Sequence, residues 1–162
     1  MTEPLADVVL SRVAIIYASP AEHDAMAQAG ALLARFGVPY DECCMSPHRS
    51  QRALAEWMSE LEPRGVEVVI AGSAGSGALA GIVAAHVTLP VVGVPLSGSS
   101  LDGSDALLGL TQLPAGVPVA AVGIDNSLNA AVLAVQVLAV GDPGLRQRLR
   151  RFKDDFEKAA VR

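Results

Sequence analysis

Short apolar runs and longer helical patterns alternate along this chain. The run at residues 13–17 is rich in β-branched residues, which is typical of a strand buried on both faces. Further strands are expected at residues 40–45, 66–71, 90–94 and 117–123. Helices are expected between and after them, at residues 21–36, 51–61, 77–85, 104–111, 126–140 and 142–158.

Strands that alternate with helices imply βαβ units, a parallel sheet and right-handed crossovers. We therefore predict an α/β fold of three layers: a doubly wound, flavodoxin-like parallel sheet with helices on both faces. Neither a linker nor an internal repeat is evident, so residues 1–162 are expected to form a single domain. Its core should span about residues 12–141, followed by an extra C-terminal helix at about 142–160.

The helix expected at residues 130–140 is apolar almost all round. Such a helix must be buried on more than one side. In a domain of this size, a subunit interface is a sensible cover, so we expect a homo-oligomer.

Charge excludes one class of partner. The net charge is −5 and the pI is about 5.1, which argues against nucleic acid, whose phosphates require a positive surface. The basic run at residues 146–153 is interleaved with apolar residues and reads as an amphipathic helix. Neither a signal peptide nor a membrane-spanning apolar run is evident, so a cytoplasmic location without membrane association is expected. Cys43 and Cys44 are expected to be structural thiols.

The segment Ser46-Pro47-His48-Arg49 carries the strongest chemical signal. It follows the strand expected at residues 40–45, and open α/β sheets bind ligands at the carboxyl ends of their strands. Arginine offers a fork of donors for phosphate or carboxylate, and histidine moves protons near neutral pH. A polar turn in which Ser50 caps the next helix explains the same residues equally well.

A glycine-rich segment follows the strand expected at residues 66–71. Its glycines are spaced G-x-x-G-x-G, which matches neither the dinucleotide-binding fingerprint nor a Walker loop. An anion site made of backbone N–H groups and a simple tight turn both remain open for this segment. Its members are Gly72, Ser73, Ala74, Gly75, Ser76 and Gly77.

The end of the first strand also carries polar groups. Ser19 could cap the following helix or bind a ligand, and Pro20 after it favours the cap. Glu22 in the first turn suits the helix dipole. His23 and His86 are expected to be structural or solvated, and we expect no metal site.

Several blocks together resemble the PurE family of purine biosynthesis, the carboxyaminoimidazole ribonucleotide mutases. The resemblance covers residues 12–153, and Ser46-Pro47-His48-Arg49 stands where the family has Ser-Ala-His-Arg. The other blocks are LPVVGVP at 89–95, LxGxDxL at 101–107, QLPxGVPV at 112–119, NAA at 129–131 and QxL at 136–138.

This resemblance implies an enzyme that moves a carboxylate from the exocyclic nitrogen of an aminoimidazole ribonucleotide to ring carbon C4, through CO2 held in a closed pocket. It further implies a homo-octamer without metal or organic cofactor. His48 would be the general acid and base, while Arg49, Ser46 and Ser19 would hold the phosphate. Glu22 would bind the ribose, and Gly72 to Gly77 would cover the base and CO2.

The chain departs from the family pattern at two places. The family opens with Gly-Ser-x-Ser-Asp where this chain has Ala18-Ser19-Pro20-Ala21-Glu22, and a family histidine and proline are Ala78 and Ala80 here. Three hypotheses follow in this order: the mutase itself, a paralog that carboxylates or decarboxylates another heteroaromatic substrate, and a non-catalytic ligand-binding relative.

Overall fold

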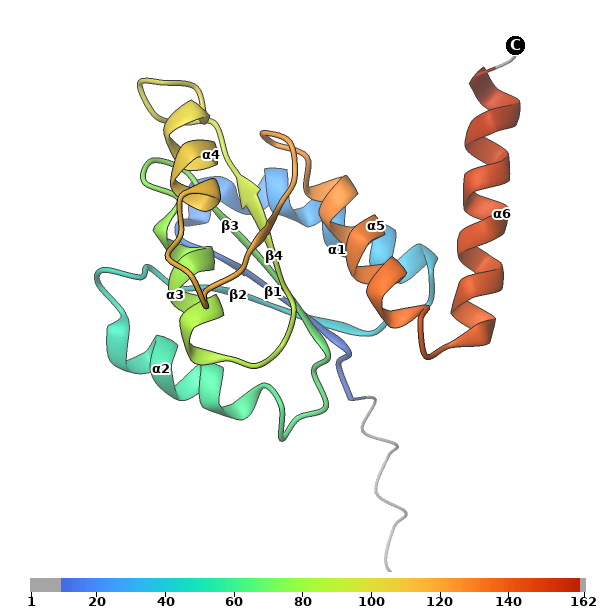
Figure 1. The fold of residues 1–162 in the computed structure, drawn as a ribbon, viewed down its shortest axis with the longest axis horizontal. Helices are drawn as coiled ribbons and strands as arrows, with labels where there is room; N and C mark the ends of the chain where they lie inside the picture. Colours follow the sequence, from blue (N-terminus) through green and yellow to red (C-terminus); the bar gives the residue numbers. More distant parts are fainter. Residues whose placement is uncertain (1–9, 161–162) are drawn as a thin grey trace, which may run out of the picture.

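A five-stranded parallel sheet lies between two layers of helices in the computed structural model, which describes residues 10–160 (Figure 1). The strand order is β2-β1-β3-β4-β5, the order of flavodoxin-like folds, so the predicted fold class is confirmed. The strands are β1 (Val13–Tyr17), β2 (Tyr40–Cys44), β3 (Val68–Ser73), β4 (Val91–Pro95) and β5 (Ala120–Ala121).

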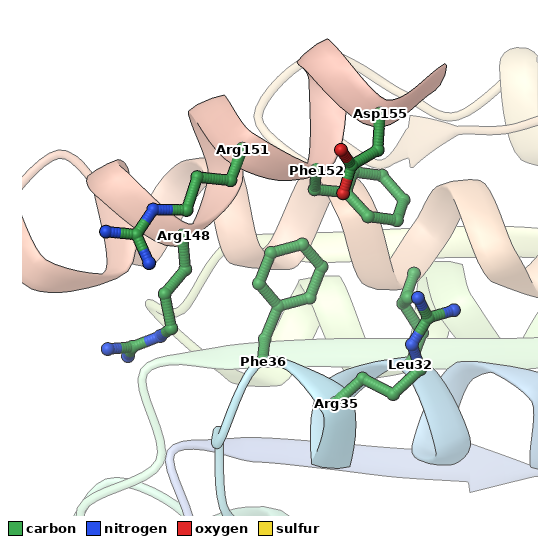
Figure 2. A pocket seen from close by; sticks show the side chains of 7 residues that line it. All are labelled: Leu32, Arg35, Phe36, Arg148, Arg151, Phe152 and Asp155. Atoms are coloured by element: carbon green, nitrogen blue, oxygen red, sulfur yellow. The ribbon is translucent and has the colours of Figure 1, made fainter. Parts of the chain in front are cut away.

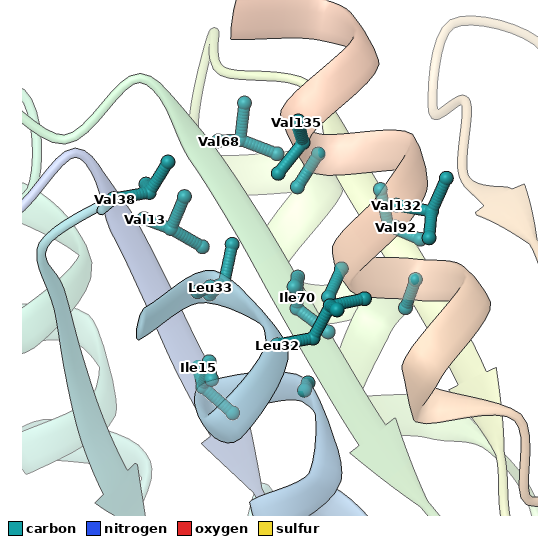
Figure 3. Close-up of a cluster of buried hydrophobic side chains, with 14 of the residues drawn as sticks. Val13, Ile15, Leu32, Leu33, Val38, Val68, Ile70, Val92, Val132 and Val135 are labelled. Atoms are coloured by element: carbon teal, nitrogen blue, oxygen red, sulfur yellow. The ribbon is translucent and has the colours of Figure 1, made fainter. Parts of the chain in front are cut away.

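The helices divide between the two faces of the sheet. They are η1 (Pro20–Glu22, a short 3-10 helix), α1 (His23–Arg35), α2 (Gln51–Glu60), α3 (Ala78–His86), α4 (Ser104–Thr111), α5 (Ser127–Leu138) and α6 (Pro143–Ala160). Successive strand residues point to opposite faces. Ile15 therefore packs in a core with α1 and α5, which Figure 3 shows, whereas Ile16 packs in a second core with α2, α3 and α4.

The apolar helix α5 is covered largely by its own chain. It packs against α1, the sheet and the start of α6, and most of its residues are buried. A subunit partner is therefore not needed to bury this helix. The argument given above for a homo-oligomer, which relied on the apolar character of residues 130–140, does not hold. The large apolar side chains that stay exposed here are Leu128 in the first turn of α5 and Val140 just after its end.

The strand predicted at residues 117–123 is much shorter in the structure. Of residues 117–123, only Ala120 and Ala121 pair with β4, opposite Val92 and Gly93. This strand forms the edge of the sheet, and Pro118 has no N–H to extend the ladder. The prediction was wrong about the length of the strand and right about its place.

Helix α6 is attached to the body mainly at its first half (Figure 1). Arg12 Nη1 donates to Asp142 Oδ2 at 2.9 Å, and Leu145 is fully buried. Further along, the rings of Phe36 and Phe152 meet edge to face with centroids 5.1 Å apart. Within residues 10–160, the helices are too short or too polar to cross a membrane.

Candidate active site

The carboxyl ends of all five parallel strands meet at one edge of the sheet. The segments that follow them are residues 18–19, 45–50, 74–77, 96–103 and 122–126. From β1 the chain passes to β2 on one side, whereas from β3 it passes to β4 on the other. This reversal makes the gap between β1 and β3 the topological switch point, where such sheets bind ligands.

The turn after β1 is built as a capping box. Ser19 lies in extended backbone at the N-cap, and its Oγ accepts a hydrogen bond from Ala21 N at 3.4 Å. Glu22 Oε2 accepts from the backbone N–H groups of Ala18 and Ser19, both at 2.8 Å. The capping role considered for Ser19 is thus confirmed, and η1 begins three residues before α1 itself.

The same carboxylate reaches a second segment of the edge. Glu22 Oε1 accepts a hydrogen bond from Ala74 N at 2.8 Å, across 52 residues of sequence. The side chain therefore joins the segment after β1 to the segment after β3, on the two sides of the switch point. Sequence reasoning missed this link, since a glutamate in a first helical turn signals only a favourable interaction with the helix dipole.

The glycine-rich segment is partly strand and partly loop. Gly72 and Ser73 are the last residues of β3 and are buried, which corrects the expected loop boundary. They pair with Val94 and Pro95 of β4. Glycine is required at position 72, because a side chain there would collide with the side chain of Met26. The loop proper is residues 74–77, and α3 begins directly after it at Ala78.

Helix α4 supports this loop from the other side. A side chain on Gly109 would collide with the carbonyl oxygen of Ser76, so glycine is required for the helix to approach the loop. Gly77 N donates to Ala74 O at 3.4 Å, which closes the loop on itself. The segment is therefore held by α4 on one side and by Glu22 on the other.

The turn after β2 carries the predicted histidine and arginine. His48 and Arg49 are both exposed at the carboxyl edge, next to the buried Pro47. Ser46 Oγ accepts from Arg49 N at 3.3 Å and from Arg49 Nε at 3.5 Å. Ser50 stands at the N-cap of α2 without a side-chain capping bond, so the purely structural hypothesis for this turn loses its main support.

Electrostatics relate this turn to the β1 segment. Burial and the charge of Glu22 raise the pKa of the Cys44 thiol, whereas the charge of Arg49 acts in the opposite direction. Glu22 and Arg49 thus both lie near Cys44, at the same part of the edge. Burial raises the pKa of Cys43 to about 12, which suits the structural thiol that was expected.

The other two histidines differ in where they lie. His86 is apart from this edge, at the end of α3, with Nδ1 2.9 Å from Ile82 O. His23 follows Glu22 at the start of α1, where it is exposed and its Nδ1 lies 3.0 Å from Asp24 Oδ1. A hollow between α1 and α6, shown in Figure 2, lies by the last turn of α1 and so near the amino edge of the sheet. Within residues 10–160, acidic, histidine and cysteine side chains form no group that could hold a metal ion.

The arrangement brings together an exposed imidazole, a guanidinium, two serine hydroxyls and a glycine-rich loop. The guanidinium and the hydroxyls can hold an anion, and the imidazole can give and take a proton near neutral pH. Of the predicted site residues, Ser19, Glu22, Ser46, His48 and Arg49 share this edge with residues 72–77.

Comparison with known proteins gives a consistent picture. The family described as AIR carboxylase matches residues 12–159. The N5-carboxyaminoimidazole ribonucleotide mutase of Pyrococcus horikoshii is 42% identical over 146 residues, which are 90% of this chain and 82% of that protein. The enzyme of the same name from Mycobacterium tuberculosis is 44% identical over 143 residues, 88% of this chain and 82% of its own.

A solved structure agrees with the fold. The crystal structure of Treponema denticola PurE superposes with a TM-score of 0.85 and 21% identity. The match covers 92% of this chain and 93% of that one. At this identity the likeness speaks for the fold alone.

Proposed function

This chain belongs to the AIR carboxylase family, and from this premise we propose that it is an N5-carboxyaminoimidazole ribonucleotide mutase of purine biosynthesis. The observation that carries the proposal is the placement of Ser46, His48 and Arg49 at the carboxyl edge, beside the switch point. These residues keep the order of the family's Ser-Ala-His-Arg motif. An enzyme of the isomerase type follows from the same relatives.

In the proposed reaction, His48 moves one proton in each direction. The carboxylate leaves the exocyclic nitrogen as CO2, and the nitrogen takes up a proton. Ring carbon C4 then attacks CO2, and the proton on C4 must leave to restore the aromatic ring. One imidazole that gives the first proton and removes the second balances the reaction without a cofactor. A pocket closed to water would keep CO2 beside the ring.

The remaining site residues are proposed to bind the nucleotide. Arg49, with the hydroxyls of Ser46 and Ser19, would hold the phosphate. The two oxygens of Glu22 accept three backbone donors, and a carboxylate has about four acceptor positions. One position on Oε1 is left for a ribose hydroxyl. Residues Gly72, Ser73, Ala74, Gly75, Ser76 and Gly77 would frame the base and CO2.

A homo-octamer in the cytoplasm is proposed as the working form. Large apolar side chains remain exposed within or next to several helices, as expected of surfaces that other subunits cover. They include Leu101, Leu108, Leu128, Val140 and Phe156. The net charge of −5 fits a small-molecule substrate better than nucleic acid.

The direct test supplies purified protein with N5-carboxyaminoimidazole ribonucleotide and follows the absorbance of the C4-carboxylated product. A parallel assay supplies aminoimidazole ribonucleotide with bicarbonate. Turnover of the first substrate at low bicarbonate is expected. Failure of both assays with a well-folded protein would favour the paralog with another heteroaromatic substrate, which the changed residues Ala21, Glu22 and Ala78 already suggest.

A further inference from the structure

We propose that Glu22 is a positioning residue that fixes the loop 74–77 relative to the turn 18–19. In this role the carboxylate sets the width of the switch point between β1 and β3. Only the kinetic consequence rests on the proposed function. The structural link itself stands on the hydrogen bonds of the described residues.

The geometry of the carboxylate carries the proposal. Oε2 holds the N–H groups of Ala18 and Ser19, and Oε1 holds that of Ala74, with all three bonds at 2.8 Å. The side chain is half-buried, so these bonds are partly shielded from water. Charge-assisted bonds of this kind are shorter and stronger than neutral ones. Both oxygens are thus engaged, each with a different segment of the edge.

The length of the side chain decides whether both segments can be held. Aspartate is shorter by one methylene group, or about 1.5 Å. A bond of 2.8 Å cannot lengthen by that amount and remain within the usual limit of about 3.2 Å. An aspartate at position 22 could therefore serve one segment or a ribose hydroxyl, but it could not join the two segments.

The clamp also selects which loop donors face the ligand. Ala74 N is used by Glu22, and Gly77 N is used by Ala74 O. Within residues 10–160, the N–H groups of Gly75 and Ser76 have no protein partner. These two donors lie in a loop that Glu22 holds on one side and Gly109 of α4 approaches closely on the other. They are the donors that we assign to the substrate.

The test compares Glu22→Asp and Glu22→Gln with a matched control, Asp24→Asn. Asp24 lies in the first turn of α1 and is fully exposed, so its variant removes a charge near the same helix end without touching either segment. Hydrogen exchange of the ligand-free protein is measured by NMR at the amide of Ala74. Steady-state kcat and KM are measured with N5-carboxyaminoimidazole ribonucleotide.

A clamp predicts that Glu22→Asp speeds exchange at Ala74 and lowers kcat about tenfold, with KM changed less than about threefold because Arg49 still holds the phosphate. Glu22→Gln should have the same effects as Glu22→Asp. Its NH2 group is a donor and cannot accept the hydrogen bonds of the backbone N–H groups that the second carboxylate oxygen accepts in the wild type. Asp24→Asn should match the wild type in both measurements. Wild-type exchange in Glu22→Asp would overturn the proposal, and so would faster exchange with unchanged kcat.

The same measurements keep the two proposals apart. Wild-type protein that fails to convert the ribonucleotide contradicts the proposed function, whatever the variants do. Exchange at Ala74 needs no substrate and still decides whether Glu22 holds the loop. A Glu22→Asp variant with wild-type kcat, KM and exchange would show that Glu22 does not clamp the loop, even if the wild-type protein converts the ribonucleotide.

Discussion

The carboxyl edge consists of a fixed side and a loosely held side. On the fixed side, Glu22 makes three bonds of 2.8 Å that join the β1 and β3 segments, and α4 touches the loop 74–77. On the loose side, Ser50 N donates to Ser46 O at 3.0 Å and closes the turn. The side chains of His48 and Arg49 are exposed there, and Arg49 meets Ser46 Oγ only at 3.3 and 3.5 Å. The two sides differ in how much order they have before any ligand arrives.

This difference assigns different tasks to the two sides. A surface that is already ordered loses little conformational entropy on binding. The free energy of its contacts is therefore available for affinity and for alignment of the ligand. Long, exposed side chains lose rotamer freedom when they bind, but they can follow a substrate whose charge moves during the reaction. We therefore expect the fixed side to align the base and the loose side to act on it.

The largest expected effect is on His48, the reactive group of the loose side. His48→Asn should lower kcat at least about 100-fold, since it removes the general acid and base. Because the side chain is exposed, the fold and the oligomeric state should not change. Assays with circular dichroism and light scattering check this. The control is His86→Asn, because His86 is also exposed. Near-wild-type activity of the His48→Asn variant would remove His48 from the mechanism.

A second variant tests whether the loose side grips the anion. Arg49→Ala should raise KM about 10- to 100-fold, the loss expected for one charge-assisted hydrogen bond of about 1.5–3 kcal/mol. The KM of Arg49→Lys should fall between those of the wild type and Arg49→Ala, because lysine keeps the charge but lacks the planar fork of donors. Arg52→Ala in the first turn of α2 is the matched control. Equal KM increases in the Arg49 and Arg52 alanine variants would show a general charge effect and no specific grip.

A third variant loosens the fixed side without touching Glu22. Gly109→Ala forces a methyl group against the carbonyl oxygen of Ser76, so it should destabilise the protein by about 1–3 kcal/mol and lower kcat several-fold. Urea unfolding and kinetics measure both effects. Gly141→Ala, where the added methyl group would meet open space, is the control. A Gly109→Ala protein as stable and active as the wild type would refute the support from α4.

The smallest effect is expected at the opposite edge of the sheet. The Leu145 N–H and the Arg12 guanidinium hold the pKa of Asp142 below its usual range. A carboxyl group whose pKa is lowered by folding contributes stability above its ordinary titration range, and this contribution is lost as the pH falls through the lowered pKa. Asp142→Asn should therefore lower Tm at neutral pH, with the difference shrinking as the pH falls and the wild-type Asp142 carboxylate takes up a proton.

Kinetics of that variant complete the comparison between the regions. Asp142→Asn keeps a capping oxygen for α6 and lies far from the carboxyl edge in the topology of the sheet. Its kcat and KM should equal those of the wild type at neutral pH. A changed kcat, or a Tm difference that does not depend on pH, would contradict this expectation.

Much of the fold could be predicted from the sequence because the central strands are buried on both faces. The apolar runs at β1, β3 and β4 are continuous, and every residue of these strands is buried. The strand β5 was predicted too long because its apolar residues lie at an edge where pairing, not composition, sets the length. The apolar character of α5 was visible, but the sequence did not reveal that α1 covers it.

The site could be predicted only in part. His48 and Arg49 were found because a polar pair after a strand signals the carboxyl edge, and the structure places both there. The joint between Glu22 and Ala74 depends on β1 and β3 being neighbours, with β2 outside them. That adjacency follows from the strand order of the sheet, and it cannot be predicted from the sequence pattern around Glu22 or around Ala74.

The joint has a consequence for the order of folding. Glu22 and Ala74 are 52 residues apart, so their bond closes a large loop that contains α1, β2 and α2. Closing such a loop costs entropy before its contacts form, which makes long-range parallel pairing slow. The bond cannot exist until β1 has met β3. A refolding chain should therefore regain helical signal well before it regains turnover.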